Sequence, residues 1–266
     1  MKVLIITVAG MSTRFSRSVG KPVIKCLYHN KSLKDSLLYI LLERSREFDY
    51  FIIVGGYRYK ELCETIRISF EEFSDKILSV ENPYYATYGS GYSLYLGLQK
   101  AFEAEAEKLK TLCAQHGVPF VVNDSVEIAL QCDADGVHVG QSDIKGRDIR
   151  SIIGPDKILG ISAGTVEEAI AAEKAGADYI GVGAIFGTST KKNARSMTME
   201  RLKEIVSSVS IPVVAIGGIS TENILQLCGS GVDGVAVVSA IFAAEDPGKA
   251  TANLLKLAQE VVASNG

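Results

Sequence analysis

The chain has 266 residues, of which 47% are apolar and 22% charged, so it can bury a sizeable core and is not a disordered protein. Its net charge of -3 and its scattered basic residues argue against a nucleic-acid partner and against binding to an anionic membrane. No apolar run reaches the roughly 18–20 residues of a membrane span. The N-terminus has no signal-peptide cleavage site, and the five cysteines contain no C-x-x-C pair, so we expect a cytoplasmic protein with reduced thiols and no zinc site.

Short β-branched runs alternate with helical stretches, a pattern typical of parallel α/β folds. The predicted strands are Val3–Val8, Tyr50–Val54, Ile77–Val80, Pro119–Val122, Gly136–Val139, Lys157–Ile161, Tyr179–Val182, Pro212–Ile216 and Gly234–Val238. The continuous apolar runs IPVVAIGG and DGVAVVSA indicate strands that are buried on both faces. Residues 101–117 form a strong helix pattern that ends at a glycine and contains no proline, so we expect a rigid helical connection between the halves.

The composition changes near residue 103, from a segment rich in Tyr and Phe to one dominated by Ala, Gly and Val. We therefore predict a Rossmann-like βαβαβα block over residues 1–103 and a partial TIM-type (βα)6 barrel over residues 104–266. The nine predicted strands exceed by one the eight of a usual barrel. Either one N-terminal strand stays outside a completed barrel, or the N-terminal block forms its own sheet and abuts it. Because an open barrel segment exposes strand edges, the N-terminal block or a second copy in a homo-oligomer would cover them.

Polar or glycine residues follow the predicted strands after residue 118, at the edge where parallel barrels bind their ligands. They are Asn123, Asp124, Gln141, Asp143, Ser162, Thr188, Thr190, Lys191, Gly217, Gly218 and Ser239. Two carboxylates at neighbouring strand ends, Asp124 and Asp143, suit a Mg²⁺ ion that bridges diphosphate oxygens. The turns Gly217–Gly218 and Val238–Ser239 leave backbone N–H groups free to bind a phosphate.

The C-terminal half, about residues 104–262, closely resembles the thiamine phosphate synthase family. The motifs VPFVVND, ADGVHVGQSD, LGIS, GADYIGVGAIFGTSTKK, IPVVAIGGIS and GVDGVAVVSAIFAAEDP follow in the family's order between Leu112 and Ala258. The family joins a hydroxymethylpyrimidine diphosphate to a thiazole phosphate and releases pyrophosphate.

The resemblance implies a role for each matching residue. Asp124 and Asp143 would hold Mg²⁺, Asn123 and Lys191 would contact the diphosphate, and Ser162 would lie near the reacting carbon. The thiazole phosphate would be held by Thr188, Thr190, Gly217, Gly218, Val238 and Ser239. Taken singly, Asp143 could instead cap a helix and Ser162 could be a turn residue.

The chain departs from this family in several places. Gly164 stands where members usually carry His, and Ala184 and Gly187 stand at usual proline positions. The family's first two strands are missing, together with the Gln-x-Arg-x-Lys run that grips the pyrophosphate. Arg58 and Lys60 follow the predicted strand at Tyr50–Val54 with the spacing of that run, so they could contact the diphosphate, although the polar start of a helix explains them as well. We interpret His138, on an apolar strand, as structural.

The N-terminal half has a second resemblance. The segments VLIITVAGMSTRFS, GKPVIK and NPYYATYGSGYSLYLGL resemble the opening of nucleotidyltransferases that activate sugar phosphates and choline phosphate. The resemblance implies nucleotide contacts by Gly10, Ser12, Thr13, Arg14 and Lys21, while a packing turn with surface charges is the alternative. The family's next strand, with its metal-binding Asp, is absent.

Each resemblance ends where the other begins, so the sequence predicts a chimera or fusion of two truncated α/β folds. The leading hypothesis for its function is thiamine phosphate synthesis from small-molecule phosphate substrates, impaired by the loss of the first two barrel strands. The alternatives are a non-catalytic fused protein that folds and binds phosphate only, and a nucleotidyltransferase.

Overall fold

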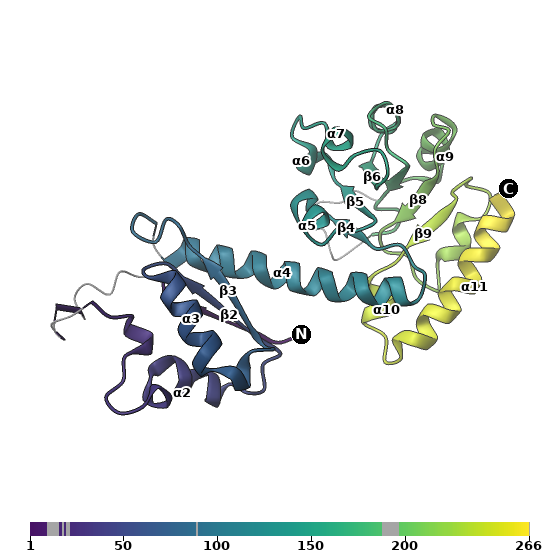
Figure 1. Ribbon diagram of the computed structural model, residues 1–266. Coiled ribbons are helices and arrows are strands. Elements are labelled where there is room, and N and C mark those ends of the chain that lie inside the picture. The colour runs from purple at the N-terminus through teal and green to yellow at the C-terminus, as the bar shows by residue number, and fades with distance from the viewer. Residues whose placement is uncertain (10–15, 18, 20–21, 89, 188–196, 266) are drawn as a thin grey trace. The chain divides into compact units, whose positions relative to one another are not determined.

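The computed structural model describes residues 1–9, 16–17, 19, 22–88, 90–187 and 197–265. The chain divides into two compact units, Met1–Leu109 and Lys110–Gly266, each built around its own parallel sheet (Figure 1). None of the helices in the described ranges is long and apolar enough to cross a membrane.

Unit 1 contains a three-stranded sheet with the order β1-β2-β3. Its strands are β1 (Val3–Thr7), β2 (Tyr50–Gly55) and β3 (Ile77–Glu81). Its helices are η1 (Lys25–Leu27), η2 (Leu33–Asp35), α2 (Leu37–Arg44), α3 (Tyr59–Ser69), η3 (Glu71–Phe73) and the start of α4 (Ser90–Gln115). β2 lies between β1 and β3, and none of the described residues of these strands pairs with the second sheet, so this sheet is separate.

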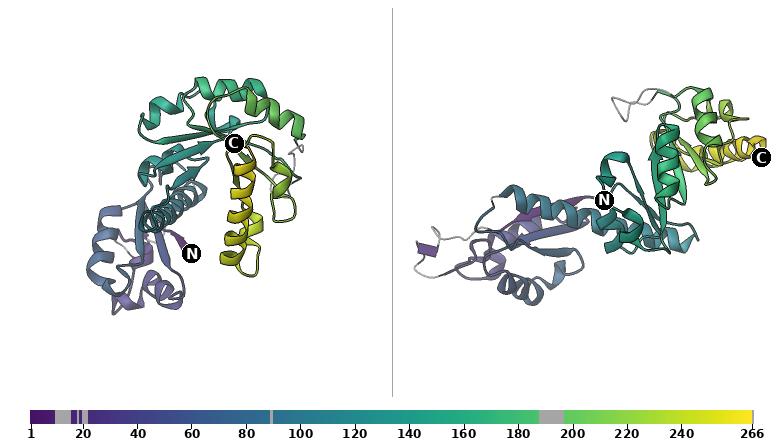
Figure 2. Two further views of the ribbon diagram at one scale, coloured as in Figure 1. Left: turned by 90° about the vertical axis from the view of Figure 1, so that its right-hand side faces the viewer. Right: turned by 90° about the horizontal axis from the view of Figure 1, so that it is seen from above.

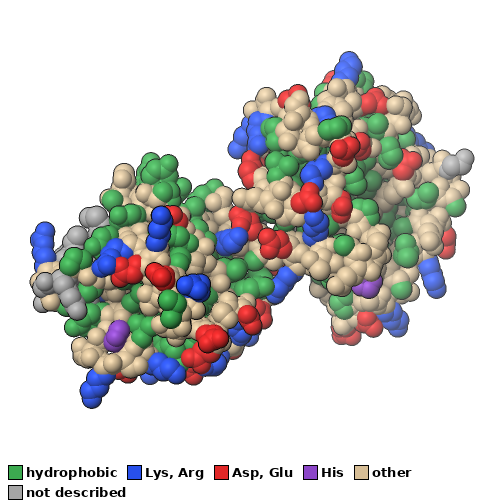
Figure 3. All heavy atoms as spheres, viewed as in Figure 1, with side chains coloured by type: hydrophobic (Ala, Val, Ile, Leu, Met, Phe, Trp, Pro, Cys, Tyr) green, Lys and Arg blue, Asp and Glu red, His purple; other side chains and the backbone are tan. Residues whose placement is uncertain are grey.

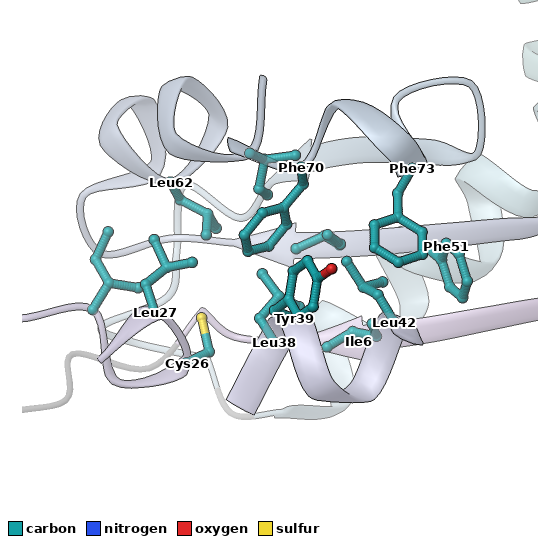
Figure 4. Packing of buried hydrophobic residues seen from close by; sticks show 13 residues of the cluster. Ile6, Cys26, Leu27, Leu38, Tyr39, Leu42, Phe51, Leu62, Phe70 and Phe73 are labelled. Atoms are coloured by element: carbon teal, nitrogen blue, oxygen red, sulfur yellow. The ribbon is translucent and has the colours of Figure 1, made fainter. Parts of the chain in front are cut away.

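The core of unit 1 lies between the sheet and its helices (Figure 4). Leu42 and Phe51 are fully buried, and Tyr39 packs edge-to-face on Phe70 and Phe73 at 5.5 and 5.9 Å between ring centroids. The start of α4 covers other side chains of the sheet. A Cβ at Gly97 would lie 2.5 Å from the Ile5 side chain, so glycine permits this close packing.

Unit 2 contains a six-stranded, all-parallel sheet in sequence order. Its strands are β4 (Val121–Asn123), β5 (Gly136–Val139), β6 (Ile158–Ala163), β7 (Tyr179–Val182), β8 (Val213–Ile216) and β9 (Gly234–Ala236). Its helices after α4 are α5 (Val126–Gln131), α6 (Gln141–Ile144), α7 (Ile149–Ile153), α8 (Val166–Lys174), α9 (Met199–Ser207), η4 (Ile224–Leu227), α10 (Ser239–Phe242) and α11 (Pro247–Asn265).

The two faces of the six-stranded sheet differ in burial. The side chains directed at the surrounding helices are buried; they are Val137, Val139, Leu159, Ile161, Ala163, Ile180, Val182, Val213 and Ala215. The alternate positions form the inner face of the curled sheet, and many of them are partly exposed, Ser162 and Ile216 among them. Figure 2 shows the helices outside the curve of the sheet. The sheet is therefore a half-barrel with an open inner face.

Short polar side chains define where the helices of unit 2 begin. Ser125, Thr165 and Thr198 cap α5, α8 and α9, each accepting a hydrogen bond from a backbone N–H three residues on. Ser125 and Thr165 lie two residues after the ends of β4 and β6. The local sequence therefore sets where the helices that follow these strands begin.

All nine predicted strands are confirmed, and their ends differ by three residues or fewer. The predicted helix over residues 101–117 is confirmed as part of α4. The prediction that an N-terminal strand completes the barrel sheet is wrong for the described residues, because β1, β2 and β3 pair only with one another. The alternative of a separate N-terminal sheet is the arrangement observed.

Candidate active site

The C-terminal ends of strands β4 to β9 follow one another along one edge of the half-barrel. Most of the described residues that the sequence singled out lie along this edge. They are Asn123, Asp124, Asp143, Ser162, Gly217, Gly218, Val238 and Ser239. Their order along the edge is their order in the chain, so Asp124 and Asp143 follow neighbouring strands, and the two turns predicted to bind phosphate follow another neighbouring pair.

Asn123 and Asp124 lie at the end of β4 with exposed side chains. Asp124 has a positive φ of 66°, and its N–H donates to the His138 carbonyl over 2.8 Å. This bond ties the end of β4 to β5. Aspartate is one of the few side chains that tolerates the left-handed backbone conformation, so the turn leaves its carboxylate at the surface.

Asp143 lies in the first turn of α6 and is half-buried. Its Oδ2 atom accepts a hydrogen bond from the Gly140 N–H over 2.9 Å. Asp143 is therefore not the N-cap residue of α6, which is Gly140, but the third helical residue, and its side chain bonds back to the N-cap backbone. A carboxylate oxygen can accept further ligands, so this contact leaves coordinating capacity.

The donor set at this edge fits Mg²⁺. Among the residues that the structure describes there is no cluster of three or more His, Cys, Asp or Glu side chains arranged to bind a metal. Asp124 and Asp143 follow neighbouring strands and are the two carboxylates that the family resemblance assigns to Mg²⁺. Mg²⁺ is commonly held by one or two carboxylates, with substrate phosphates and water completing its coordination.

Ser162 lies on the inner face of β6 beside His138, the histidine that the sequence favours as a structural residue. The Nε2 atom of His138 lies 2.9 Å from the Ser162 hydroxyl, and its Nδ1 atom lies 3.0 Å from the hydroxyl of Tyr179. The side chain of Gln141 donates to the Ser162 carbonyl over 2.7 Å. Ser162 is thus a strand residue with hydrogen-bonded neighbours, and the alternative that it is a turn residue is wrong. Strand alternation places His138 and Tyr179 on the inner face, but their contact requires the register of three strands.

Gly217 and Gly218 form a turn after β8 that only glycine can adopt easily, with φ values of 101° and 69°. A Cβ at Gly218 would lie 2.6 Å from the carbonyl oxygens of Phe186 and Gly187. The Asn223 side chain donates to the Gly218 carbonyl over 2.8 Å and stabilises the turn. Val238 and Ser239, at the start of α10, are exposed beyond the next strand.

The turn at Gly217 and Gly218 should bind an inorganic anion in the absence of any other substrate, because its donors are backbone N–H groups. Crystals soaked in sulfate should show density at the Gly218 N–H. A matched soak of Gly218→Ala crystals should show none, since the Cβ forces the turn to move. Absence of density in the parent crystals would contradict this assignment.

The departures from the family pattern have specific local structures. The Gly164 N–H, directly after β6, donates to the Glu168 side chain of α8 over 2.7 Å. This backbone donor therefore already has a partner within the chain. The Ala184 carbonyl accepts from the Met197 N–H over 2.9 Å, and the Ile185 and Phe186 N–H groups donate to the carbonyls of Ile216 and Gly217 at 3.0 Å each. Backbone pairing therefore holds the Ala184–Phe186 segment.

Several predicted residues lie outside the described residues, namely Thr188, Thr190, Lys191, Gly10, Ser12, Thr13, Arg14 and Lys21. Arg58 and Lys60 lie in unit 1, at the start of α3. The Arg58 guanidinium donates to the Pro22 carbonyl over 3.1 Å and pairs with Glu61. The structure therefore gives Arg58 local partners within its own unit.

A family model described as thiamine monophosphate synthase matches residues 97–241. The chain belongs to the thiamine monophosphate synthase family. It is 53% identical over 156 residues to the thiamine-phosphate synthase of Ruminiclostridium cellulolyticum, covering 59% of this chain and 74% of that protein. It is 54% identical over 151 residues to that of Methanobrevibacter smithii, covering 57% and 72%.

A solved structure of thiamine phosphate pyrophosphorylase from Pyrococcus furiosus aligns with a TM-score of 0.57 and 30% identity, covering 98% of this chain and 96% of that one. A second family model, a domain of unknown function, matches residues 21–149 and crosses the boundary that we predicted near residue 103. Its description gives no support to a nucleotidyltransferase or to a fusion of two truncated enzymes.

Proposed function

We propose that this chain is a transferase that joins hydroxymethylpyrimidine diphosphate to thiazole phosphate, forming thiamine phosphate and pyrophosphate. The observation that carries the proposal is the edge of the half-barrel, where Asn123, Asp124, Asp143, Ser162 and Gly218 lie in one row within a member of this family. Both substrates are small phosphorylated molecules, consistent with a cytoplasmic enzyme.

Each group on the edge has a chemical role in this reaction. Asp124 and Asp143 would hold Mg²⁺, which when bound neutralises negative charge on the diphosphate. Asn123 and Lys191 would bind diphosphate oxygens and orient the leaving group. The Gly217–Gly218 turn, with Val238, Ser239, Thr188 and Thr190, would hold the thiazole phosphate so that its ring nitrogen faces the carbon that reacts. Holding both reactants in place lowers the entropic part of the barrier.

A panel of two assays tests the proposal. Purified protein receives the pyrimidine diphosphate, the thiazole phosphate and Mg²⁺, and in parallel CTP or UTP with phosphocholine or a sugar phosphate. Thiamine phosphate above the blank is the expected result. Pyrophosphate released only with a nucleotide, or no product in either assay, would refute the proposed transferase.

Substitution of Arg58 tests whether this side chain contacts the diphosphate or only forms bonds within unit 1. We expect Arg58→Ala to keep the parent's kcat and KM, because the guanidinium is already bonded to Pro22 and Glu61 within unit 1. The measurement is the rate at saturating substrate, with folding checked by circular dichroism. A fall of about 10²-fold, the cost of one lost transition-state donor, would instead indicate that Arg58 contacts the diphosphate.

A further inference from the structure

Three side chains on the inner face of the half-barrel form a continuous hydrogen-bonded chain, from Tyr179 through His138 to Ser162. The two distances are 3.0 Å at Nδ1 of His138 and 2.9 Å at its Nε2 atom. The imidazole and phenol rings lie 5.4 Å apart between centroids and are tilted by 35°. Each residue belongs to a different strand, so both ring nitrogens of His138 are engaged by neighbours across the sheet.

Two glycines provide the space that these rings occupy. A Cβ at Gly160 would lie 2.3 Å from Cζ of Tyr179 and 2.4 Å from Nδ1 of His138, and a Cβ at Gly181 would lie 2.9 Å from Cε1 of His138. Gly160 is paired with His138 on one side and with Tyr179 on the other. Packing as well as hydrogen bonding therefore specifies where the imidazole lies.

Ser162 is held at two points. Its hydroxyl contacts His138, and its carbonyl accepts from the Gln141 side chain over 2.7 Å. Both partners come from β5 or from the helix that follows it. The position of the hydroxyl is thus fixed relative to Asp143, which lies on that same helix.

The direction of the two hydrogen bonds depends on which nitrogen of His138 carries the proton. A neutral imidazole has one donor and one acceptor nitrogen. With the proton on Nε2, the Tyr179 hydroxyl donates to Nδ1 and Nε2 donates to the Ser162 oxygen. With the proton on Nδ1, the imidazole donates to Tyr179 and the Ser162 hydroxyl donates to Nε2. Only the first tautomer leaves the Ser162 proton available to another acceptor.

We propose that Tyr179 is a positioning residue that acts through His138 to leave the Ser162 hydroxyl free to donate to the pyrimidine diphosphate. The inference rests on the proposed function, in which Ser162 lies near the carbon whose bond to the diphosphate breaks. A hydrogen bond donated to the departing oxygen stabilises the negative charge that develops there. No proton moves along the chain; Tyr179 and His138 determine only which atom of the hydroxyl group faces the substrate.

The first test is the tautomer of His138 in the resting protein, measured by ¹⁵N NMR of histidine-labelled samples. The chain has three histidines, so the His138 signals are assigned by comparison with His138→Gln. The expected parent spectrum has the proton on Nε2, and Tyr179→Phe should shift the Nδ1 signal because it loses its donor. Tyr39→Phe is the matched control: it removes a hydroxyl bonded to Glu72 in unit 1 and should leave His138 unchanged.

The second test is kinetic. Tyr179→Phe should lower kcat about tenfold with KM for both substrates within about twofold, and Ser162→Ala should lower kcat about 10²-fold. The double variant should be no slower than Ser162→Ala alone, because residues acting as one unit lose their contribution once. Tyr39→Phe should keep the parent's kcat.

Two results would overturn the inference. The first is an NMR result: a proton on Nδ1 of His138 in the parent, or His138 signals that are the same in the parent and in Tyr179→Phe. The other is a double variant whose losses multiply, which would show that Tyr179 acts by a route other than Ser162. A parent that forms no thiamine phosphate would refute the proposed function, while the NMR measurement, made without substrate, would still decide the hydrogen-bond directions.

Discussion

Replacing Asp124 with alanine should lower kcat/KM for thiamine phosphate formation by about 10³-fold. Asp124 and Asp143 follow neighbouring strands at the C-terminal edge of the half-barrel, and the substitution removes one of the two carboxylates that we propose hold Mg²⁺ there. We expect a large loss because Mg²⁺ would bind more weakly to Asp143 alone and would neutralise the diphosphate charge less well while the C–O bond breaks. Initial rates measured across a Mg²⁺ titration are the readout, and the activity that remains should need a higher Mg²⁺ concentration.

The matched control is Asp156→Ala. Asp156 is an exposed aspartate that precedes β6, at the opposite end of the same strands, so its loss removes equal charge away from the ligand edge. We expect it to keep the parent's rate and Mg²⁺ dependence. Equal losses in both variants would mean that net charge rather than metal binding matters, and a fully active Asp124→Ala would remove Asp124 from the metal site.

Replacing Phe51 with alanine should destabilise unit 1 by about 3–5 kcal/mol, the usual cost of deleting a fully buried phenylalanine side chain. Phe51 is 0% exposed in the central strand β2 and packs edge-to-face on Phe73, with ring centroids 6.0 Å apart. The cavity cannot be refilled by solvent-facing residues, because strands on both sides hold β2 in place.

Amide hydrogen exchange read peptide by peptide is the appropriate measurement, since a chain with two compact units need not unfold in one step. We expect faster exchange across β1, β2 and β3 and unchanged exchange across β4 to β9. Phe102→Ala is the control, because that ring is 57% exposed and its removal should cost less than about 0.5 kcal/mol. Faster exchange in both sheets would show that the two units unfold together.

Basic and acidic side chains are interspersed on the face of the molecule shown in Figure 3, as expected from a net charge of -3 with scattered lysines and arginines. The mixed surface charge, like the existence of the strands, can be predicted from the sequence alone. Each strand of unit 2 is a short apolar run ended by glycine or a polar residue, so the existence of the strand can be predicted from the run itself. The positions of Asn123, Asp124 and Gly218 at strand ends could be predicted for the same reason. The prediction that the runs IPVVAIGG and DGVAVVSA are buried on both faces is wrong, because Ile216 is 40% exposed on the open inner face of the sheet.

The partners of the site residues could not be predicted, because they depend on register and curvature. Strand alternation places His138 on the inner face, but the register of β5, β6 and β7 decides that it meets Ser162 on one side and Tyr179 on the other. Likewise, apolar β1, β2 and β3 suit either a barrel or a separate sheet. Tertiary structure decides between them: among the described residues β1, β2 and β3 pair only with one another, and β2 has its backbone hydrogen-bonded to a strand on each side.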